Sequence, residues 1–352
     1  MVSEQRRLAA DPRPPLGVLL TGGRGTRLQP LTPALPKSLV PLLDRPLVAH
    51  GLALLAELGL REIVVVVGGD DALTGPAALR HAPDGVAVRV AVQAQPRGPG
   101  DALACVGDAL EGRVVVVLAV DTVLRGHDLL RQLSAFERSG AVGWLPLHET
   151  DRPREMGIAE LADGGRGERI VTLEEKPAAP RSNLACVGVW MLAPAAVARV
   201  RGDPVINARG ESDLTATVAA LLREGHVVGG ARVPGRWLDT GSLGALLATQ
   251  AALLGELTPG PPFVAPGCEL TGVVRSLDGA TVAASRLVGP LLIASAARID
   301  GCELGPDVVV GEGAVLSGVT LRHALVAPGA HLEGGVYECV VVTSDGVVTS
   351  AR

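Results

Sequence analysis

Three glycines and two basic residues lie close together near the amino terminus and could bind a phosphate group. The glycines are Gly22, Gly23 and Gly25. They directly follow an apolar run at residues 16–20, which predicts a short buried strand. A glycine-rich turn after a strand leaves successive backbone N–H groups free to face an anion, and Arg27 and Lys37 add positive charge beside it. The spacing fits neither the P-loop nor the dinucleotide fingerprint, and a tight turn without a ligand is the alternative.

An aspartate, Asp121, follows the most apolar strand that the sequence predicts, residues 114–120. A carboxylate that faces phosphate groups is repelled by them unless a cation lies between, so Asp121 is a candidate Mg²⁺ ligand. The alternative is an aspartate that only caps the turn after the strand.

A loop with two glutamines follows another predicted strand, residues 86–92, so it should lie at the same edge of the sheet as the glycine-rich turn. The loop contains Gln93 and Gln95 and turns at Gly98. A glutamine amide both donates and accepts hydrogen bonds, so it can read the edge of a nucleobase, although a loop glutamine is more often only solvated.

Opposite charges end a third predicted strand, where Glu175 and Lys176 precede a proline. Successive side chains of a strand point to opposite faces, so we expect these two side chains not to pair with each other. They are then free to bind a ligand as an acceptor and a point charge, or they are an ordinary exposed pair.

The whole segment at residues 22–41 reads GGRGTRLQPLTPALPKSLVP, and two further motifs accompany it: Glu-Glu-Lys-Pro at 174–177 and Trp-Leu-Asp-Thr-Gly at 237–241. The segment at residues 22–41 resembles the signature of the sugar nucleotidyltransferases, GGxGTRLxPLTxxxPKxLxP, which it matches at every fixed position. The two further motifs strengthen the resemblance to that family. The resemblance spans residues 16–352 and looks closest to the long-form glucose-1-phosphate thymidylyltransferases. It implies an enzyme that joins a nucleoside triphosphate, with dTTP favoured, to glucose 1-phosphate or a related sugar or cyclitol phosphate, releasing pyrophosphate.

The resemblance also implies a role for each motif residue. Arg27 and Lys37 would hold the triphosphate and the departing pyrophosphate, and Asp121 and Asp239 would be the catalytic metal pair, with Mg²⁺ as cofactor. The implied nucleotide-binding residues are Gly22, Gly23, Gly25, Thr26, Gln93 and Gly98. The implied sugar-phosphate-binding residues are Gly157, Glu175, Lys176 and Gly188.

Other functions stay open at this point. An adenylyl-, guanylyl- or uridylyltransferase of the same family would keep the same charged residues. A catalytically impaired regulatory homologue is a second class, because four positions depart from the family pattern: Ser38, Pro99, Val120 and Thr122. Acyl transfer by the carboxyl-terminal region is a third, with His323 and His331 as the candidates.

Apolar strands alternate with helix-like segments along residues 16–255, which predicts an α/β fold with a Rossmann-like, mixed, mostly parallel sheet and helices on both faces. The helix-like segments are residues 47–58, 102–110, 129–138, 214–223 and 243–254. We expect this catalytic domain to follow a disordered tail at residues 1–15, and 352 residues suffice for a second domain.

The second domain, residues 256–352, contains a short repeat in which apolar residues lie six positions apart around a glycine turn. Its copies are residues 264–270, 310–316 and 326–332. Hexapeptide repeats predict a parallel β-helix, and the resemblance implies that it is left-handed. Such a domain is mainly structural and offers a surface for subunit contact, so we expect a homo-oligomer.

Composition excludes several classes of protein. The net charge of -5 and the absence of a long basic run argue against nucleic acid as a partner. The polar first 15 residues lack the apolar core of a secretory signal, and no apolar run approaches membrane-span length, so we expect a cytoplasmic protein without a membrane partner. The five cysteines are scattered without a CxxC pair, which argues against a disulfide framework or a zinc site.

Overall fold

The computed structural model describes residues 13–23, 28, 35–162, 168–258, 260 and 265–343, together with the backbone of 348–350. The chain forms two compact units, one of Met1–Gly23 with Val48–Trp237 and one of Arg24–Leu47 with Leu238–Arg352. Each unit is described by itself. The sequence-based domain boundary at residue 255 stays a prediction.

The first unit is built on a ten-stranded mixed sheet. Its strands, in order across the sheet, are β10 (Ile170–Glu175), β9 (Gly157–Leu161), β11 (Leu184–Cys186), β8 (Gly143–Glu149), β12 (Val189–Leu192), β6 (Val115–Ala119), β1 (Leu16–Leu20), β4 (Glu62–Gly68) and β5 (Ala87–Gln93), with β13 (Val228–Arg232) beside β8. Seven strands, β1, β4, β5, β6, β8, β9 and β13, share one direction, and β10, β11 and β12 run against them. This arrangement confirms the predicted mixed, mostly parallel sheet.

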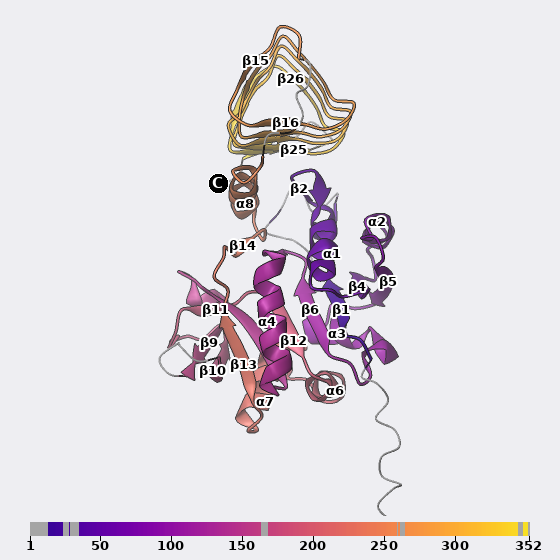
Figure 1. The fold of residues 1–352 in the computed structure, drawn as a ribbon, viewed down its shortest axis with the longest axis vertical. Coiled ribbons are helices and arrows are strands. Elements are labelled where there is room, and N and C mark those ends of the chain that lie inside the picture. Colours follow the sequence, from indigo (N-terminus) through magenta and orange to yellow (C-terminus); the bar gives the residue numbers. More distant parts are fainter. Residues whose placement is uncertain are drawn as a thin grey trace, which may run out of the picture. The chain divides into compact units, whose positions relative to one another are not determined.

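Helices pack on both faces of this sheet because its central strands are apolar on both sides (Figure 1). Val18 of β1 faces a core shared with three helices: α3 (Pro99–Ala104), α6 (Pro194–Gly202) and α7 (Leu214–Arg223). Leu19 points the other way and packs against Gly51 of α1 (Leu47–Glu57). On that same face, the Trp144 indole donates a hydrogen bond of 2.6 Å to Gln132 of α4 (Gly126–Ser139). A fifth helix, α2 (Thr74–Arg80), lies beside β4 and β5.

Most predicted helices are confirmed, and α7 has the predicted bounds, but the helix predicted at residues 102–110 is wrong in its limits. The α-helix there, α3, begins at Pro99 and ends at Ala104, and a short 3₁₀ turn follows at Gly107–Leu110. Proline suits the first position of a helix because its missing N–H would have no partner there. Gly107 has a φ of 71° and interrupts the helix. The prediction from apolar periodicity alone therefore merged two separate elements into one helix.

The carboxyl-terminal part of the second unit consists of short parallel strands in three sheets. The strands of the first sheet are β15 (Glu269–Thr271), β18 (Arg286–Val288), β21 (Glu303–Leu304), β24 (Thr320–Arg322) and β27 (Val336–Glu338). The second sheet contains β16 (Val274–Ser276), β19 (Leu291–Ile293), β22 (Val308–Val310), β25 (Ala324–Val326), β28 (Val340–Val342) and the antiparallel β29 (Val348–Ser350). The third contains β17 (Thr281–Ala283), β20 (Arg298–Asp300), β23 (Val315–Ser317) and β26 (His331–Glu333). From β15 to β28, successive strands visit the three sheets in turn, which is consistent with the predicted β-helix (Figure 1).

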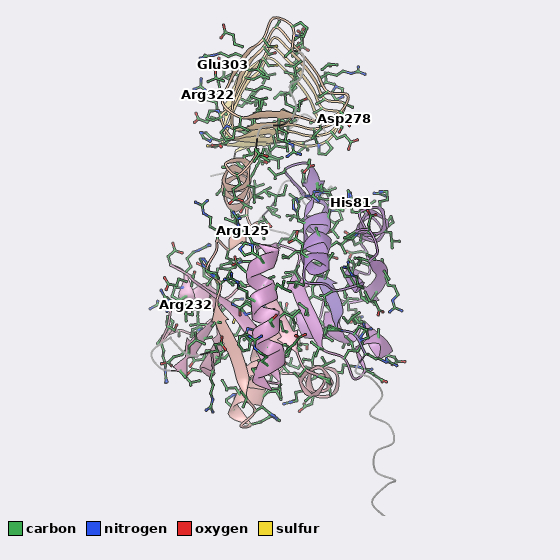
Figure 2. The ribbon with its side chains drawn as sticks, viewed as in Figure 1. His81, Arg125, Arg232, Asp278, Glu303 and Arg322 are labelled. Atoms are coloured by element: carbon green, nitrogen blue, oxygen red, sulfur yellow. The ribbon has the colours of Figure 1, made fainter. Side chains whose placement is uncertain are left out.

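In the first of these sheets, the strands β18, β21 and β24 each bury one leucine inside the coils. These leucines, Leu287, Leu304 and Leu321, are fully buried. The neighbouring positions face outward and carry charges, as in the ion pair of 3.4 Å between Arg322 and Glu303, both labelled in Figure 2. A strand with one face toward the interior of the coils and the other toward water needs this alternation.

Ser285 is buried at a corner of these coils, and its replacement by alanine should weaken the fold. Its hydroxyl donates to the carbonyl of Ala283 (2.6 Å) and accepts from the N–H of Cys302 in the next coil (2.9 Å). Ser285→Ala leaves that buried N–H unpaired, at a cost of about 1–3 kcal/mol in the free energy of unfolding. Ser317→Ala, at an exposed position of β23, is the matched control and should cost less than about 0.5 kcal/mol in the same denaturant titration. Equal effects of the two variants would contradict this role of Ser285.

Within the described part of the chain, no helix is both long enough and apolar enough to span a membrane.

Candidate active site

Three candidate residues lie at the carboxyl ends of parallel strands of the first unit. Gly22 follows β1, Gln93 ends β5, and Asp121 follows β6. Leu20 pairs with Ala119 in the sheet, and the N–H of Val120 donates to the carbonyl of Leu20 (3.1 Å). Because parallel strands end together, the structure brings Gly22, Gln93 and Asp121 to one edge of the sheet, where ligands of such folds bind.

Gln93 is held in a fixed orientation at this edge. Its side chain is buried, and its amide nitrogen donates both to the carbonyl of Gly98 (3.0 Å) and to Oδ2 of Asp101 (2.7 Å). A carbonyl and a carboxylate can only accept hydrogen bonds, so the amide atom of Gln93 that faces them must be the nitrogen. The oxygen Oε1 therefore faces Gly22, where a Cβ would lie 3.5 Å away, and is left as the acceptor. Gln95, the other candidate, is exposed and accepts from Arg97.

Asp121 lies in the turn between β6 and β7 (Thr122–Val123) and is partly buried. The residues on either side are fixed: Val120 is only 5% exposed, and the Thr122 hydroxyl donates to the carbonyl of Val187 (2.8 Å). Gly188, with a φ of 74°, packs on that hydroxyl, and a Cβ there would lie 2.5 Å from it. The two departures from the family motif, Val120 and Thr122, are therefore buried parts of the turn that carries the carboxylate.

The remaining phosphate and metal candidates belong to other parts of the chain. Gly23 is described, but Gly25, Thr26 and Arg27 lie outside the described residues. Lys37 begins a 3₁₀ turn, Lys37–Leu39, in the second unit, where Ser38 is fully buried.

Asp239 also belongs to the second unit and ends the short strand β14 (Leu238–Asp239). Its Oδ1 accepts from the N–H of Gly241 (2.9 Å), and its carbonyl accepts from the hydroxyl of Thr249 on α8 (Leu243–Leu254) at 2.9 Å. Ser242 then caps that helix by accepting from Ala245 N–H. The local hydrogen bonds thus fix the direction of the Asp239 side chain.

Two of the sugar-phosphate candidates, Gly157 and Lys176, lie beside Glu175, whereas Gly188 lies against the Thr122 hydroxyl. Gly157 of β9 pairs with Glu175 of β10, and a Cβ on Gly157 would lie 2.9 Å from the Glu175 carboxylate. The expectation that Glu175 and Lys176 do not pair is wrong, since the Lys176 ammonium lies 3.6 Å from Oε1 of Glu175. The strand ends at Glu175, and Lys176 has a φ of 47°, so the alternation of a strand no longer applies to it.

Three residues that sequence reasoning did not single out surround this carboxylate. Burial, and then the nearby charge of Asp213, raise the pKa of Glu175, while Lys176 lowers it. Burial raises the pKa of the Cys186 thiol strongly, with Glu175 and Asp213 adding to the effect, so this thiol stays neutral. Thr215 packs against Gly157. The role of Asp213 as an N-cap could have been predicted from the sequence, because an aspartate directly before an apolar helix typically caps it.

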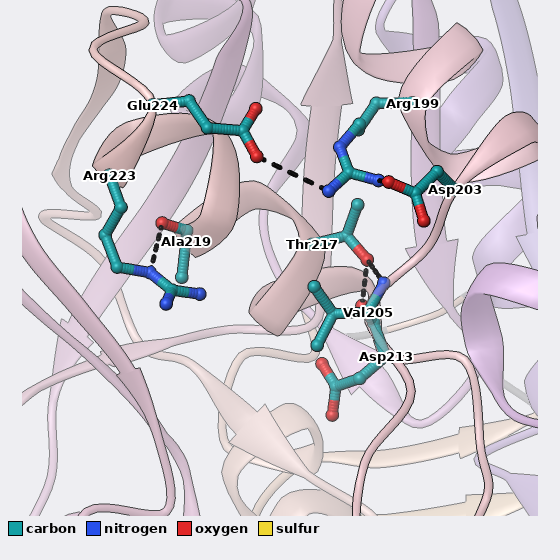
Figure 3. A network of polar contacts seen from close by, with 8 residues as sticks. All are labelled: Arg199, Asp203, Val205, Asp213, Thr217, Ala219, Arg223 and Glu224. Atoms are coloured by element: carbon teal, nitrogen blue, oxygen red, sulfur yellow. Dashed lines mark hydrogen bonds and ion pairs between the residues drawn. The ribbon is translucent and has the colours of Figure 1, made fainter.

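The helix α7 that carries Thr215 is anchored at both ends. Asp213 caps its first turn by accepting from Ala216 N–H (2.8 Å). The hydroxyl of Thr217 accepts from Val205 N–H (2.9 Å), and Glu224 forms an ion pair with Arg199 of α6 (Figure 3). These contacts fix the helix beside the Glu175 carboxylate.

A mixed α/β sheet with Gly22, the buried Gln93 amide and the Asp121 carboxylate at one edge is typical of nucleotide-binding α/β domains. Residues 16–256 match the family model described as nucleotidyl transferase, and the chain belongs to that family. It is therefore a nucleotidyltransferase, and enzymes of this family generally use a divalent metal ion.

Relatives of known function agree with this family. The chain is 30% identical over 323 residues to a glucose-1-phosphate thymidylyltransferase of Streptomyces griseus, a match that covers 90% of this chain and 88% of the relative. It is 31% identical over 321 residues to the enzyme of the same name from Streptomyces antibioticus, with the same coverage. A solved UDP-glucose pyrophosphorylase from Acinetobacter baumanii shares the fold, with a TM-score of 0.59 and 24% identity over 68% of this chain and 93% of that chain. These matches confirm the resemblance to the sugar nucleotidyltransferases.

Proposed function

We propose that the protein joins a nucleoside triphosphate, with dTTP favoured, to a sugar 1-phosphate such as glucose 1-phosphate, and releases pyrophosphate. The observation that carries this proposal is the set of Gly22, Gln93 and Asp121 at one edge of the sheet. The curated relatives that match most of the chain are glucose-1-phosphate thymidylyltransferases, which supports both substrates. A related sugar or cyclitol phosphate is the second candidate acceptor.

The orientation of Gln93 supports a base with a ring N–H. With its amide nitrogen bound to Gly98 and Asp101, Gln93 offers only its oxygen to a base. Thymine and uracil carry a ring N–H on the edge that such an acceptor would meet, and guanine carries one in the larger purine. Adenine and cytosine present a lone pair at the corresponding ring nitrogen, so they could donate to this oxygen only through their exocyclic amino group. We therefore expect dTTP or UTP ahead of GTP, and ATP and CTP last.

The reaction requires positioning and charge stabilisation rather than a covalent nucleophile. An oxygen of the sugar phosphate attacks the α-phosphorus of the triphosphate, a new P–O bond forms, and the bond from the α-phosphorus to the bridging oxygen of pyrophosphate breaks. In this proposal Arg27 and Lys37 balance the negative charge of the triphosphate and of pyrophosphate. Glu175 accepts hydrogen bonds from sugar hydroxyls, Lys176 binds the sugar phosphate, and the absence of a side chain at Gly157 leaves room for the sugar.

The two aspartates suit a hard divalent cation, which we propose to be Mg²⁺. Within the described ranges, no group of three or more His, Cys, Asp or Glu side chains could hold a metal ion by itself. Mg²⁺ is commonly bound by one or two carboxylates while phosphate oxygens and water complete its shell. Asp121 is partly exposed at the strand end, and in the turn after β14 Asp239 accepts from the N–H of Gly241 through Oδ1. When bound, Mg²⁺ would neutralise phosphate charge.

The proposal extends to the rest of the molecule. The three parallel sheets support a parallel β-helix as the carboxyl-terminal domain, and its left-handedness is proposed from the family resemblance alone. We also propose that this domain joins copies of the chain into a homo-oligomer and that the enzyme works in the cytoplasm on soluble sugar phosphates.

A screen of five triphosphates, dTTP, UTP, GTP, ATP and CTP, against several sugar 1-phosphates tests the proposed function. Pyrophosphate release should be fastest with dTTP or UTP and should require both substrates and Mg²⁺. A regulatory homologue would instead bind these ligands without releasing pyrophosphate. No release from any pair would refute the proposed reaction.

The acid limb of the activity profile should follow the protonation of Glu175. Because burial and Asp213 raise its pKa, Glu175 takes up a proton at a higher pH than an ordinary glutamate. Protonation removes an acceptor for the sugar, so kcat/KM for the sugar phosphate should fall as the pH drops through this pKa. Asp213→Asn removes one cause of the shift but keeps the Oδ1 that caps α7, so it should move the acid limb to lower pH.

Glu175→Gln is the companion variant, and it should lack this limb while the titration of the substrate phosphate, which has a pKa of about 6, remains. Rates are measured as pyrophosphate release at low sugar phosphate over a series of pH values. An acid limb at the same pH in the native enzyme and in both variants would exclude Glu175 as its origin.

A further inference from the structure

The loop behind Gln93 and the segment before α7 are joined by two backbone hydrogen bonds. The N–H of Gly100 donates to the carbonyl of Ser212 (2.9 Å), and the N–H of Ser212 donates to the carbonyl of Arg97 (2.7 Å). Ser212 is buried, and among the described residues its hydroxyl has no hydrogen-bond partner. This junction lies entirely within the first unit.

The junction leaves no room for either segment to shift alone. Gly98 has a φ of 95°, and a Cβ there would lie 2.6 Å from the carbonyl oxygen of Ser212. A Cβ on Gly100 would collide with the Ser212 hydroxyl and lie 3.2 Å from the Ser212 Cβ. Two hydrogen bonds and glycine contacts thus make residues 97–100 and Ser212 move together.

One side of the junction belongs to the nucleotide site. The carbonyl of Gly98 and the carboxylate of Asp101, on either side of Gly100, are the two acceptors that orient the Gln93 amide. A base that binds to Gln93 therefore fixes the position of this loop.

The other side belongs to the sugar-phosphate site. Ser212 directly precedes Asp213, whose carboxylate caps α7 and raises the pKa of Glu175. One turn on, the methyl group of Thr215 contacts Gly157, and its hydroxyl accepts from the Trp190 indole (3.2 Å). A displacement of Ser212 is therefore passed to the first turn of α7, beside the Glu175 carboxylate.

We propose that Gly100 and Ser212 form a positioning pair that couples the two substrate sites, so that each bound substrate tightens the binding of the other. This inference rests on the proposed function, since it takes Gln93 as the base site and Glu175 as the sugar site. A ligand that orders one side of the junction lowers the cost of ordering the other side. Thermodynamic linkage then requires that the effect be reciprocal.

Gly100→Ala tests the junction at a position where alanine suits the backbone. Gly100 lies in α3, and alanine favours a helix over glycine by about 1 kcal/mol, so the variant should fold. The new methyl group must, however, push Ser212 away. Affinity is measured calorimetrically for the α,β-methylene analogue of dTTP, which cannot release pyrophosphate, with and without saturating glucose 1-phosphate in Mg²⁺.

In the native enzyme, glucose 1-phosphate should tighten binding of the analogue by at least about 5-fold, the lower end of usual coupling factors. In Gly100→Ala the factor should fall to less than about 2-fold, below the usual range of such coupling. Gly202→Ala, at a helical glycine of α6 with open space around it, is the matched control and should keep the native factor. Gly100→Ala/Ser212→Gly, which removes the obstructing side chain, should restore most of the coupling.

Native coupling in Gly100→Ala would overturn the inference, as would a native enzyme that releases pyrophosphate but shows no coupling. If Gly100→Ala does not bind the analogue at all, the double variant decides. Recovery of coupled binding in the double variant supports the inference, and failure to recover it overturns the inference. Absence of pyrophosphate release from the native enzyme would instead refute the proposed function, so the two failures are distinct.

Discussion

Asp239→Asn should lower the rate of nucleotidyl transfer by about 10²–10³-fold, the usual loss when one fixed electrostatic group is removed from an active site. The asparagine keeps an oxygen at the position that accepts from Gly241 N–H, so the turn before α8 is preserved. Only the negative charge and one anionic oxygen are lost. The rate is measured as pyrophosphate release at saturating substrates and Mg²⁺, with thermal unfolding to check the fold.

Asp278→Asn is the matched control for this variant. Asp278 also lies in the second unit and precedes a glycine turn, but it is exposed on the carboxyl-terminal coils (Figure 2). It should retain full activity. Near-native rates in Asp239→Asn would remove Asp239 from the catalytic machinery, and equal losses in both variants would indicate a non-specific effect of charge.

Asp121→Asn should cause a loss of similar size, about 10²–10³-fold, because this carboxylate would face the same phosphate groups from the first unit. Asp70→Asn is its control, since Asp70 is an exposed aspartate in the turn after β4, another parallel strand of the same sheet. A near-native rate for Asp121→Asn would leave the turn-capping interpretation of this residue in place.

The double variant gives the sharper result. Two carboxylates that hold one ion act as a unit, and residues that act as a unit have grossly non-additive effects. Asp121→Asn/Asp239→Asn should therefore lose little more activity than the more impaired single variant. Losses that multiply would show that the two aspartates act independently.

The fold could be predicted from the sequence where local signals and packing agree. Strands such as residues 16–20 and helices such as 214–223 are marked by apolar periodicity and by caps, and the structure has them at those positions. The 102–110 segment shows the limit, because the positive φ of Gly107 splits an apolar run that looks continuous. Several elements without a distinct signal, among them α2, α6, β8 and β13, were not predicted at all.

The candidate site was predictable as motifs but not as contacts. Gln93 and Glu175 are recognisable from their places at strand ends, yet the partners that orient them are distant in sequence. The pairing of Glu175 with Lys176 depends on a single left-handed residue, which no strand pattern reveals. The charge of Asp213 acts on Glu175 across 38 positions of the chain, so only the folded structure could show it.

The transfer of labelled oxygen tests the central claim most directly. Glucose 1-phosphate carrying ¹⁸O at its three non-bridging phosphate oxygens is incubated with dTTP, Mg²⁺ and the native enzyme, and both products are analysed by mass spectrometry. Attack by the sugar phosphate on the α-phosphorus predicts that all three labels remain in the nucleoside diphosphate sugar and that pyrophosphate carries none. Labelled pyrophosphate, or release of a nucleoside monophosphate without a labelled sugar nucleotide, would contradict the account.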